Sequence, residues 1–152
     1  MTPTAIETPP SLGAPLGAFT TRWSVADAEL SRLVPHANNV QVLGWIDRLA
    51  ELHHDSFGAS RVRMHSEGRM WFVARHEIDY LSEAFAGDQL AGATWVTSLG
   101  RTSLSRATLV WNISTGRSVC RATSRWAHVD LAARRPSRVP DGERAMLAPL
   151  TA

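Results

Sequence analysis

The residues of this sequence that could do chemistry are concentrated in one short stretch. The polar members are His36, Asn38 and Asn39, and the helix-compatible run that follows them opens with Val40 and Gln41. The first turn of a helix carries backbone N–H groups without intrahelical acceptors and the positive end of the helix dipole. A carbonyl oxygen aimed at the two opening N–H groups would be polarised there. The stretch therefore predicts a site for a reactive group, with His36 as general base and an asparagine orienting a water.

An apolar face at helical spacing predicts the element that positions this cluster. The recurring residues are Val42, Trp45, Ile46, Leu49 and Leu52, and they favour a helix over residues 40–55. Asn39 is well placed as its N-cap, a structural role that is compatible with a catalytic one. Gly58 suits the C-terminal end.

The rest of the chain changes to a period of two, which is typical of strands. The expected strands cover residues 18–25, 61–64, 69–81, 89–99, 104–113 and 117–130, with a hairpin turn at 114–116. One long helix among antiparallel strands predicts an α+β fold with the helix on a concave sheet face. Residues 1–17, rich in proline and glycine, are expected to be a flexible arm, and residues 18–152 a single domain.

Composition narrows the class of protein. All 16 basic residues are arginine and the net charge is only +2, with no basic stripe of the kind that binds nucleic acid. Cys120 is the one cysteine, so no intrachain disulfide forms. Neither a signal peptide nor a membrane-spanning run stands out, so we expect a cytoplasmic protein without membrane insertion.

Three motifs, in consistent order, resemble those of hotdog-fold acyl thioesterases. The run 36–45 is similar to the His-Val-Asn-Asn segment and most like that of the acyl-carrier-protein thioesterases. The run 78–83, followed by Gly87-Asp88, resembles the acidic-Tyr…Glu…Gly-Asp strand and turn of the superfamily. The run 134–140 is similar to the Arg-Pro…Ile-Pro segment that ends the last strand.

The resemblance implies a hotdog fold, with about five antiparallel strands wrapped around one long central helix. It implies hydrolysis of an acyl-CoA or acyl-carrier-protein thioester by a homodimer or a dimer of dimers, without metal or cofactor. Glu83 matches the catalytic Glu of the family, so it is expected either to pair with His36 or to act as the base.

One departure from the family pattern leaves alternatives open. Acyl-carrier-protein thioesterases carry Asp and Asn at alternate positions before the His, and here Arg32 and Val34 stand there. The nearest upstream acid is Asp27, a candidate member of the site or simply a helix cap. A non-catalytic acyl-thioester binding module is therefore one rival. A 3-hydroxyacyl-thioester dehydratase is another, which the His/Asn/Asn context disfavours.

Further residues are candidates for substrate binding. Trp45 and Trp71 would line an acyl tunnel or belong to the core. Three arginines near the C-terminus would bind coenzyme A phosphates or an acidic carrier protein, or form a solvated tail: Arg134, Arg135 and Arg138. Adjacent histidines on a helix point in different directions, so His53 and His54 do not predict a metal site.

Overall fold

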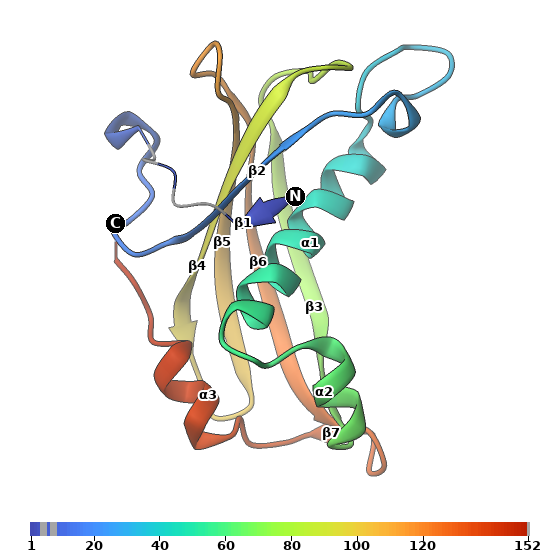
Figure 1. Cartoon of the computed structure of the whole chain (residues 1–152). Helices are drawn as coiled ribbons and strands as arrows, with labels where there is room; N and C mark the ends of the chain where they lie inside the picture. The colour runs from blue at the N-terminus through green and yellow to red at the C-terminus, as the bar shows by residue number, and fades with distance from the viewer. Residues whose placement is uncertain (4–5, 7–8, 152) are drawn as a thin grey trace.

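The computed structural model describes residues 1–3, 6 and 9–151. A curved antiparallel sheet encloses one long helix, α1 (Asn39–Ser56), on its concave face (Figure 1). The long strands are β2 (Phe19–Ser24), β3 (Arg69–Tyr80), β4 (Gln89–Leu99), β5 (Ser103–Asn112) and β6 (Ser118–Asp130). The predicted α+β architecture is confirmed, and its arrangement is that of the hotdog fold.

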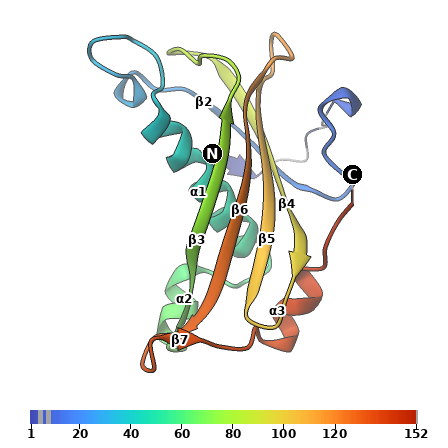
Figure 2. The same ribbon diagram turned by 180° about the vertical axis from the view of Figure 1, so that it is seen from behind.

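The sheet has the strand order β1-β2-β4-β5-β6-β3, which places β3 at one edge. Two short strands extend it: β1 (Thr2–Pro3) pairs with β2, and β7 (Arg135–Pro136) pairs with β6. The start of α1, the β3–β4 connection and the β5–β6 hairpin gather at one end of the molecule, called here the His36 end. Helices α2 (Arg61–Ser66) and α3 (Asp141–Met146) lie at the other, the α3 end (Figure 2).

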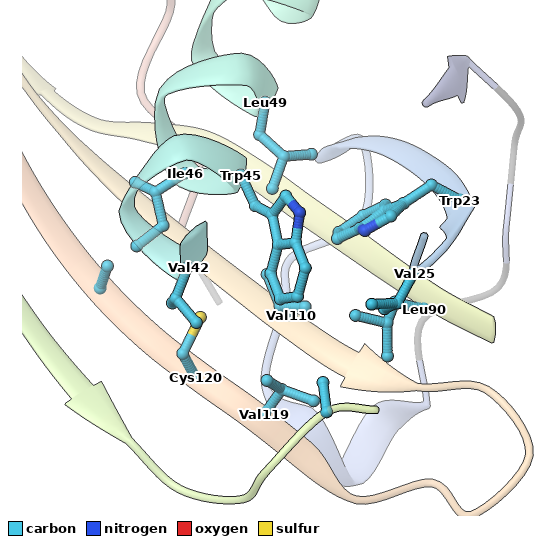
Figure 3. Close-up of a cluster of buried hydrophobic side chains, with 12 residues drawn as sticks. Trp23, Val25, Val42, Trp45, Ile46, Leu49, Leu90, Val110, Val119 and Cys120 are labelled. Carbon is cyan, nitrogen blue, oxygen red and sulfur yellow. The ribbon is translucent and has the colours of Figure 1, made fainter. Parts of the chain in front are cut away.

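The core lies between α1 and the sheet. Figure 3 shows Val42, Trp45, Ile46 and Leu49 of α1 pointing toward the strands at the His36 half of the helix. A second apolar cluster, with Ala50, Trp71 and Trp126, occupies the other half. A Cβ atom on Gly92 of β4 would lie 2.7 Å from Leu49 Cδ1, so glycine is what allows the helix to approach the strand this closely.

Two local predictions were wrong. Asn38 is the N-cap of α1, since its side chain accepts a hydrogen bond from the Gln41 N–H, and the predicted cap Asn39 is the first helical residue. Residues 61–64 were expected to form a strand, yet they begin α2. Ser60 caps that helix by accepting from the Arg63 N–H at 3.2 Å, and such local capping favours helix over a four-residue alternation.

The N-terminal part of the chain adds to the edge and the outer face of the sheet, whereas Leu147, after α3, joins the inner cluster of Ala50 and Trp71. Residues 4, 5, 7 and 8 of the predicted arm lie outside the described residues. In the described part, β1 hydrogen-bonds to β2, and Leu12 is buried in a third apolar cluster with Trp95, Leu109 and Trp111. Near the other end, α3 is followed by Leu147, which is fully buried.

Candidate active site

His36 and Glu83 form a side-chain pair at the His36 end. The His36 Nδ1 atom lies 2.9 Å from a carboxylate oxygen of Glu83. Their backbones are held together by the N–H of Ala37, which donates to the Ala84 carbonyl at 2.9 Å. The imidazole is 30% exposed and the carboxylate 61%, so solvent and substrate reach both groups. The structure therefore brings together His36 and Glu83, the two residues that the sequence analysis expected to pair.

The start of α1 supplies backbone donors directly after His36. Of the two N–H groups predicted to polarise a carbonyl, that of Gln41 is engaged, because it donates to the Asn38 side chain at 3.0 Å. Within the described residues, the N–H groups of Asn39 and Val40 have no acceptor. These two are the donors the helix terminus can offer to an oxyanion.

Glu29, and not Asp27, is the acid that reaches α1. Asp27 is exposed on a short 3₁₀ helix, η2 (Asp27–Glu29), and its carboxylate contacts neither His36 nor α1 in the described part of the chain. Glu29 Oε1 accepts from the Gln41 side-chain amide at 3.0 Å and from the Trp45 indole at 2.9 Å. Sequence reasoning missed Glu29: its carboxylate also accepts from the Ala26 N–H at 2.7 Å, but an alanine at the N-cap leaves no capping-box signature in the sequence.

An open groove of about 460 Å³ runs past Glu83. Leu81 and Phe85 line it and are each 48% exposed, and Arg117 closes it on the β5–β6 hairpin. The groove therefore offers the carboxylates of Glu83 and Asp88 beside apolar surface, with Arg117 as a cation. A second open pocket, of about 420 Å³, lies along Glu29, Gly44 and Trp45.

The two tryptophans predicted to contact substrate are core residues. Trp45 is 2% exposed and packs against Trp23 with 5.6 Å between ring centroids. Trp71 is also buried, with its ring against His54 and His128. It lines a small cavity of about 20 Å³ beside Arg106.

The arginines near the C-terminus lie at the α3 end. Arg134 and Arg135 are exposed, whereas Arg138 pairs with Asp141 at 2.6 Å. Arg138 also lines an open pocket of about 280 Å³ with Arg101 and Arg144. Sequence reasoning missed these last two, since they come from the β4–β5 turn and α3. The twelve residues of β3 span roughly 35 Å, which is about the distance that separates this end from Glu83.

The histidine pair at the end of α1 packs toward the sheet, with His54 buried and His53 partly buried. His53 Nδ1 lies 2.8 Å from the guanidinium of Arg106. Burial, and then the charge of Arg106, lower the pKa of His53 to about 3. Across the described residues, no three His, Cys, Asp or Glu side chains converge as metal ligands would. No described helix is long and apolar enough to cross a membrane.

Comparison with known sequences places the chain in a family. The model of the acyl-ACP thioesterase N-terminal domain matches residues 18–147. A chloroplastic acyl-[acyl-carrier-protein] hydrolase from Cuphea viscosissima is 32% identical over 98 residues, covering 64% of this chain and 24% of that protein. A palmitoyl-acyl carrier protein thioesterase from Gossypium hirsutum is 32% identical over 102 residues, which cover 67% of this chain and 24% of that protein. The matched part of the chain thus spans about a quarter of the length of these relatives.

Solved structures share the fold. A 1,4-dihydroxy-2-naphthoyl-CoA thioesterase from Synechocystis superposes with a TM-score of 0.80 at 18% identity, over 86% of this chain and 96% of that one. The 12:0-ACP thioesterase from Umbellularia californica superposes with a TM-score of 0.70 at 21% identity, over 85% of this chain and 52% of that one. The chain thus has the hotdog fold that these structures share. By its matched domain, it belongs to the acyl-ACP thioesterase family.

Proposed function

We propose that this protein hydrolyses the thioester of an acyl-CoA or an acyl-carrier protein. The observation that carries the proposal is the His36–Glu83 pair at 2.9 Å, directly before the free N–H groups that open α1. Membership of the acyl-ACP thioesterase family supports the same reaction. It also favours this reaction over the dehydratase.

In the proposed mechanism, Glu83 orients the base. The ionised carboxylate only accepts, so His36 donates from Nδ1–H and keeps the lone pair of Nε2 for a proton. Nε2 takes a proton from water as the water oxygen bonds to the thioester carbonyl carbon. The negative charge on the carbonyl oxygen is stabilised by the N–H groups of Asn39 and Val40. The tetrahedral intermediate then expels the thiolate, which receives the proton from Nε2 and leaves a carboxylic acid.

In the proposed assembly, the protein works as a homodimer or a dimer of dimers, and two protomers pair through the free edge of β3. Phe72, Val73 and Tyr80 on that strand are 42%, 45% and 54% exposed, an apolar edge of the kind that pairs with another chain. An isologous antiparallel pairing sets the α3 end of one protomer beside the His36 end of its partner. We assign the binding of the substrate's phosphates to the basic pocket of Arg101, Arg138 and Arg144 at the α3 end.

The test is thiol release by the purified chain from matched acyl-CoA and acyl-carrier-protein substrates of graded chain length. We expect turnover, and the preferred carrier assigns the substrate class. If the chain binds acyl-CoA and acyl-carrier protein saturably but releases thiol from neither, the proposed hydrolysis is overturned. The protein would then be a non-catalytic acyl-thioester binding module.

A further inference from the structure

A second polar cluster lies far from His36, under the last turns of α1. Arg106 of β5 points into the concave face and is 1% exposed. Its Nη1 atom contacts His53 Nδ1 at 2.8 Å and Thr94 Oγ1 at 3.3 Å, whereas Nη2 has no hydrogen-bond partner in the described part of the chain. Among the described residues, no carboxylate forms an ion pair with this guanidinium.

The buried charge is therefore uncompensated. Burial lowers the pKa of Arg106 to about 10, so the side chain is still a cation at neutral pH. His53 is neutral there, since its pKa is lowered to about 3, and it can only accept from the arginine. A buried cation without an anionic partner is unfavourable. The arrangement suits a ligand that brings the negative charge.

The surroundings of Arg106 are those of an anion pocket. Trp71 and Trp126 line the same cavity of about 20 Å³, and each has a buried indole N–H without an acceptor among the described residues. Guanidinium and indole groups can only donate hydrogen bonds, so the free N–H groups of these three side chains can be satisfied only by acceptor atoms. The cavity has room for about one or two water-sized groups, which is the size of a carboxylate head.

The walls of the pocket fit an organic carboxylate. Ala50, Met64, Met70 and Leu104 supply apolar surface for methylene groups. Among the described residues of the lining, Glu51 is the acidic one. It is engaged at the rim with Arg48 and with Arg61, whose Nε is 3.8 Å from its carboxylate. In the proposed dimer, antiparallel pairing of β3 also brings the Trp71 end of that strand toward the partner subunit's Glu83.

We propose that the Arg106–Trp71–Trp126 pocket binds a carboxylate. The carboxylate comes either from the distal end of a dicarboxylic acyl thioester or from a free carboxylate anion. The first source rests on the proposed hydrolysis, and the second does not.

The first experiment compares glutaryl-CoA with pentanoyl-CoA, which have equal chain length and differ in the distal carboxylate. We expect the wild type to prefer glutaryl-CoA in kcat/KM by at least about tenfold, and Arg106→Met to lose that preference. Arg125→Met, an exposed arginine on neighbouring β6, is the matched control and keeps it. Trp71→Phe and Trp126→Phe each remove one donor and retain a ring, so they test the pocket if Arg106→Met does not fold.

The second experiment is calorimetric titration of the intact chain with glutarate, glutaryl-CoA and pentanoyl-CoA. Glutarate binding that Arg106→Met abolishes, together with equal handling of the two thioesters, assigns the pocket to a free anion. Tighter glutaryl-CoA binding without turnover retains the pocket and rejects the hydrolysis. Absence of any Arg106-dependent difference in both experiments would overturn the pocket.

Discussion

His36 Nδ1 and Glu83 Oε1 meet at 2.9 Å although the two residues lie 47 positions apart in the chain. The hydrogen bond from the Ala37 N–H to the Ala84 carbonyl joins the residues that directly follow each of them. The pairing is thus supported by a backbone hydrogen bond beside it, and not only by the two side chains. A base oriented in this way loses little freedom when substrate binds.

Asn38 and Asn39 differ in role despite being adjacent. Asn38→Ala removes the acceptor of the Gln41 N–H and should lower the free energy of unfolding by about 1 kcal/mol. Asn39→Ala, at an exposed first helical position, should change it by no more than about 0.5 kcal/mol. Urea unfolding of both variants measures the difference, and equal losses would contradict the assignment of the cap.

Two glycine-to-alanine variants should shift stability in opposite directions. Gly92→Ala drives a methyl group against Leu49 and Trp23 and should cost about 1–3 kcal/mol of unfolding free energy. Gly142→Ala, in α3, meets no atom within 4 Å and should stabilise by up to about 1 kcal/mol. Thermal and urea unfolding check both; a neutral Gly92→Ala would mean that α1 does not approach β4 so closely.

Acid should destabilise the fold through the histidines beside Arg106. The pKa of His53 falls from 6.5 to about 3 on folding, and that of His54 is lowered as well, by burial first and then by Arg106. Between pH 6.5 and 3 the unfolded chain binds more protons than the folded one. The free energy of unfolding should therefore decrease as pH falls, by up to about 1.4 kcal/mol per pH unit for each group.

The pH series of unfolding free energies should become shallower in His53→Gln, which keeps an acceptor for Arg106 but no titrating ring. His65→Gln, on the exposed side of α2, is the control and should leave the slope as it is. An unchanged slope in His53→Gln would refute the coupling between this histidine and stability.

The free edge of β3 should set the oligomeric state. We expect light scattering to give at least the mass of a dimer for the wild type and that of one chain for Phe72→Lys, because a charge on an edge strand opposes pairing. Val62→Lys replaces an equally apolar residue on α2 that is 81% exposed, and it should leave the mass unchanged. A monomeric wild type would reject the proposed interface.

Long periodic segments were predictable from the sequence, and short or tertiary features were not. The apolar face from Val42 to Leu52 extends over three turns, so α1 was placed within one residue at each end. The alternation over 61–64 is too short to separate strand from helix, and a serine cap decided it. The contact of Glu29 with Trp45 exists only because η2 folds back on α1, which no local pattern encodes.

The arginine of the second pocket did leave a signal in the sequence. Leu104, Arg106, Thr108 and Val110 alternate on the inward face of β5, so a charged residue stood where apolar ones were expected. The basic pocket at the α3 end left none, because Arg101 and Arg144 are distant in sequence from Arg138 and meet only through the packing of α3.

The most direct test of the central claim is kcat/KM for thiol release in His36→Ala, Glu83→Ala and the double variant, on the substrate that the wild type prefers. Each single change should lower kcat/KM by about 10²–10⁴-fold. The double variant should be little worse than either, since the two residues act as one unit. Asp55→Ala, which removes an exposed carboxylate from the last turn of α1, should keep the wild-type value. Wild-type rates in both single variants would contradict the His36–Glu83 pair as the catalytic base.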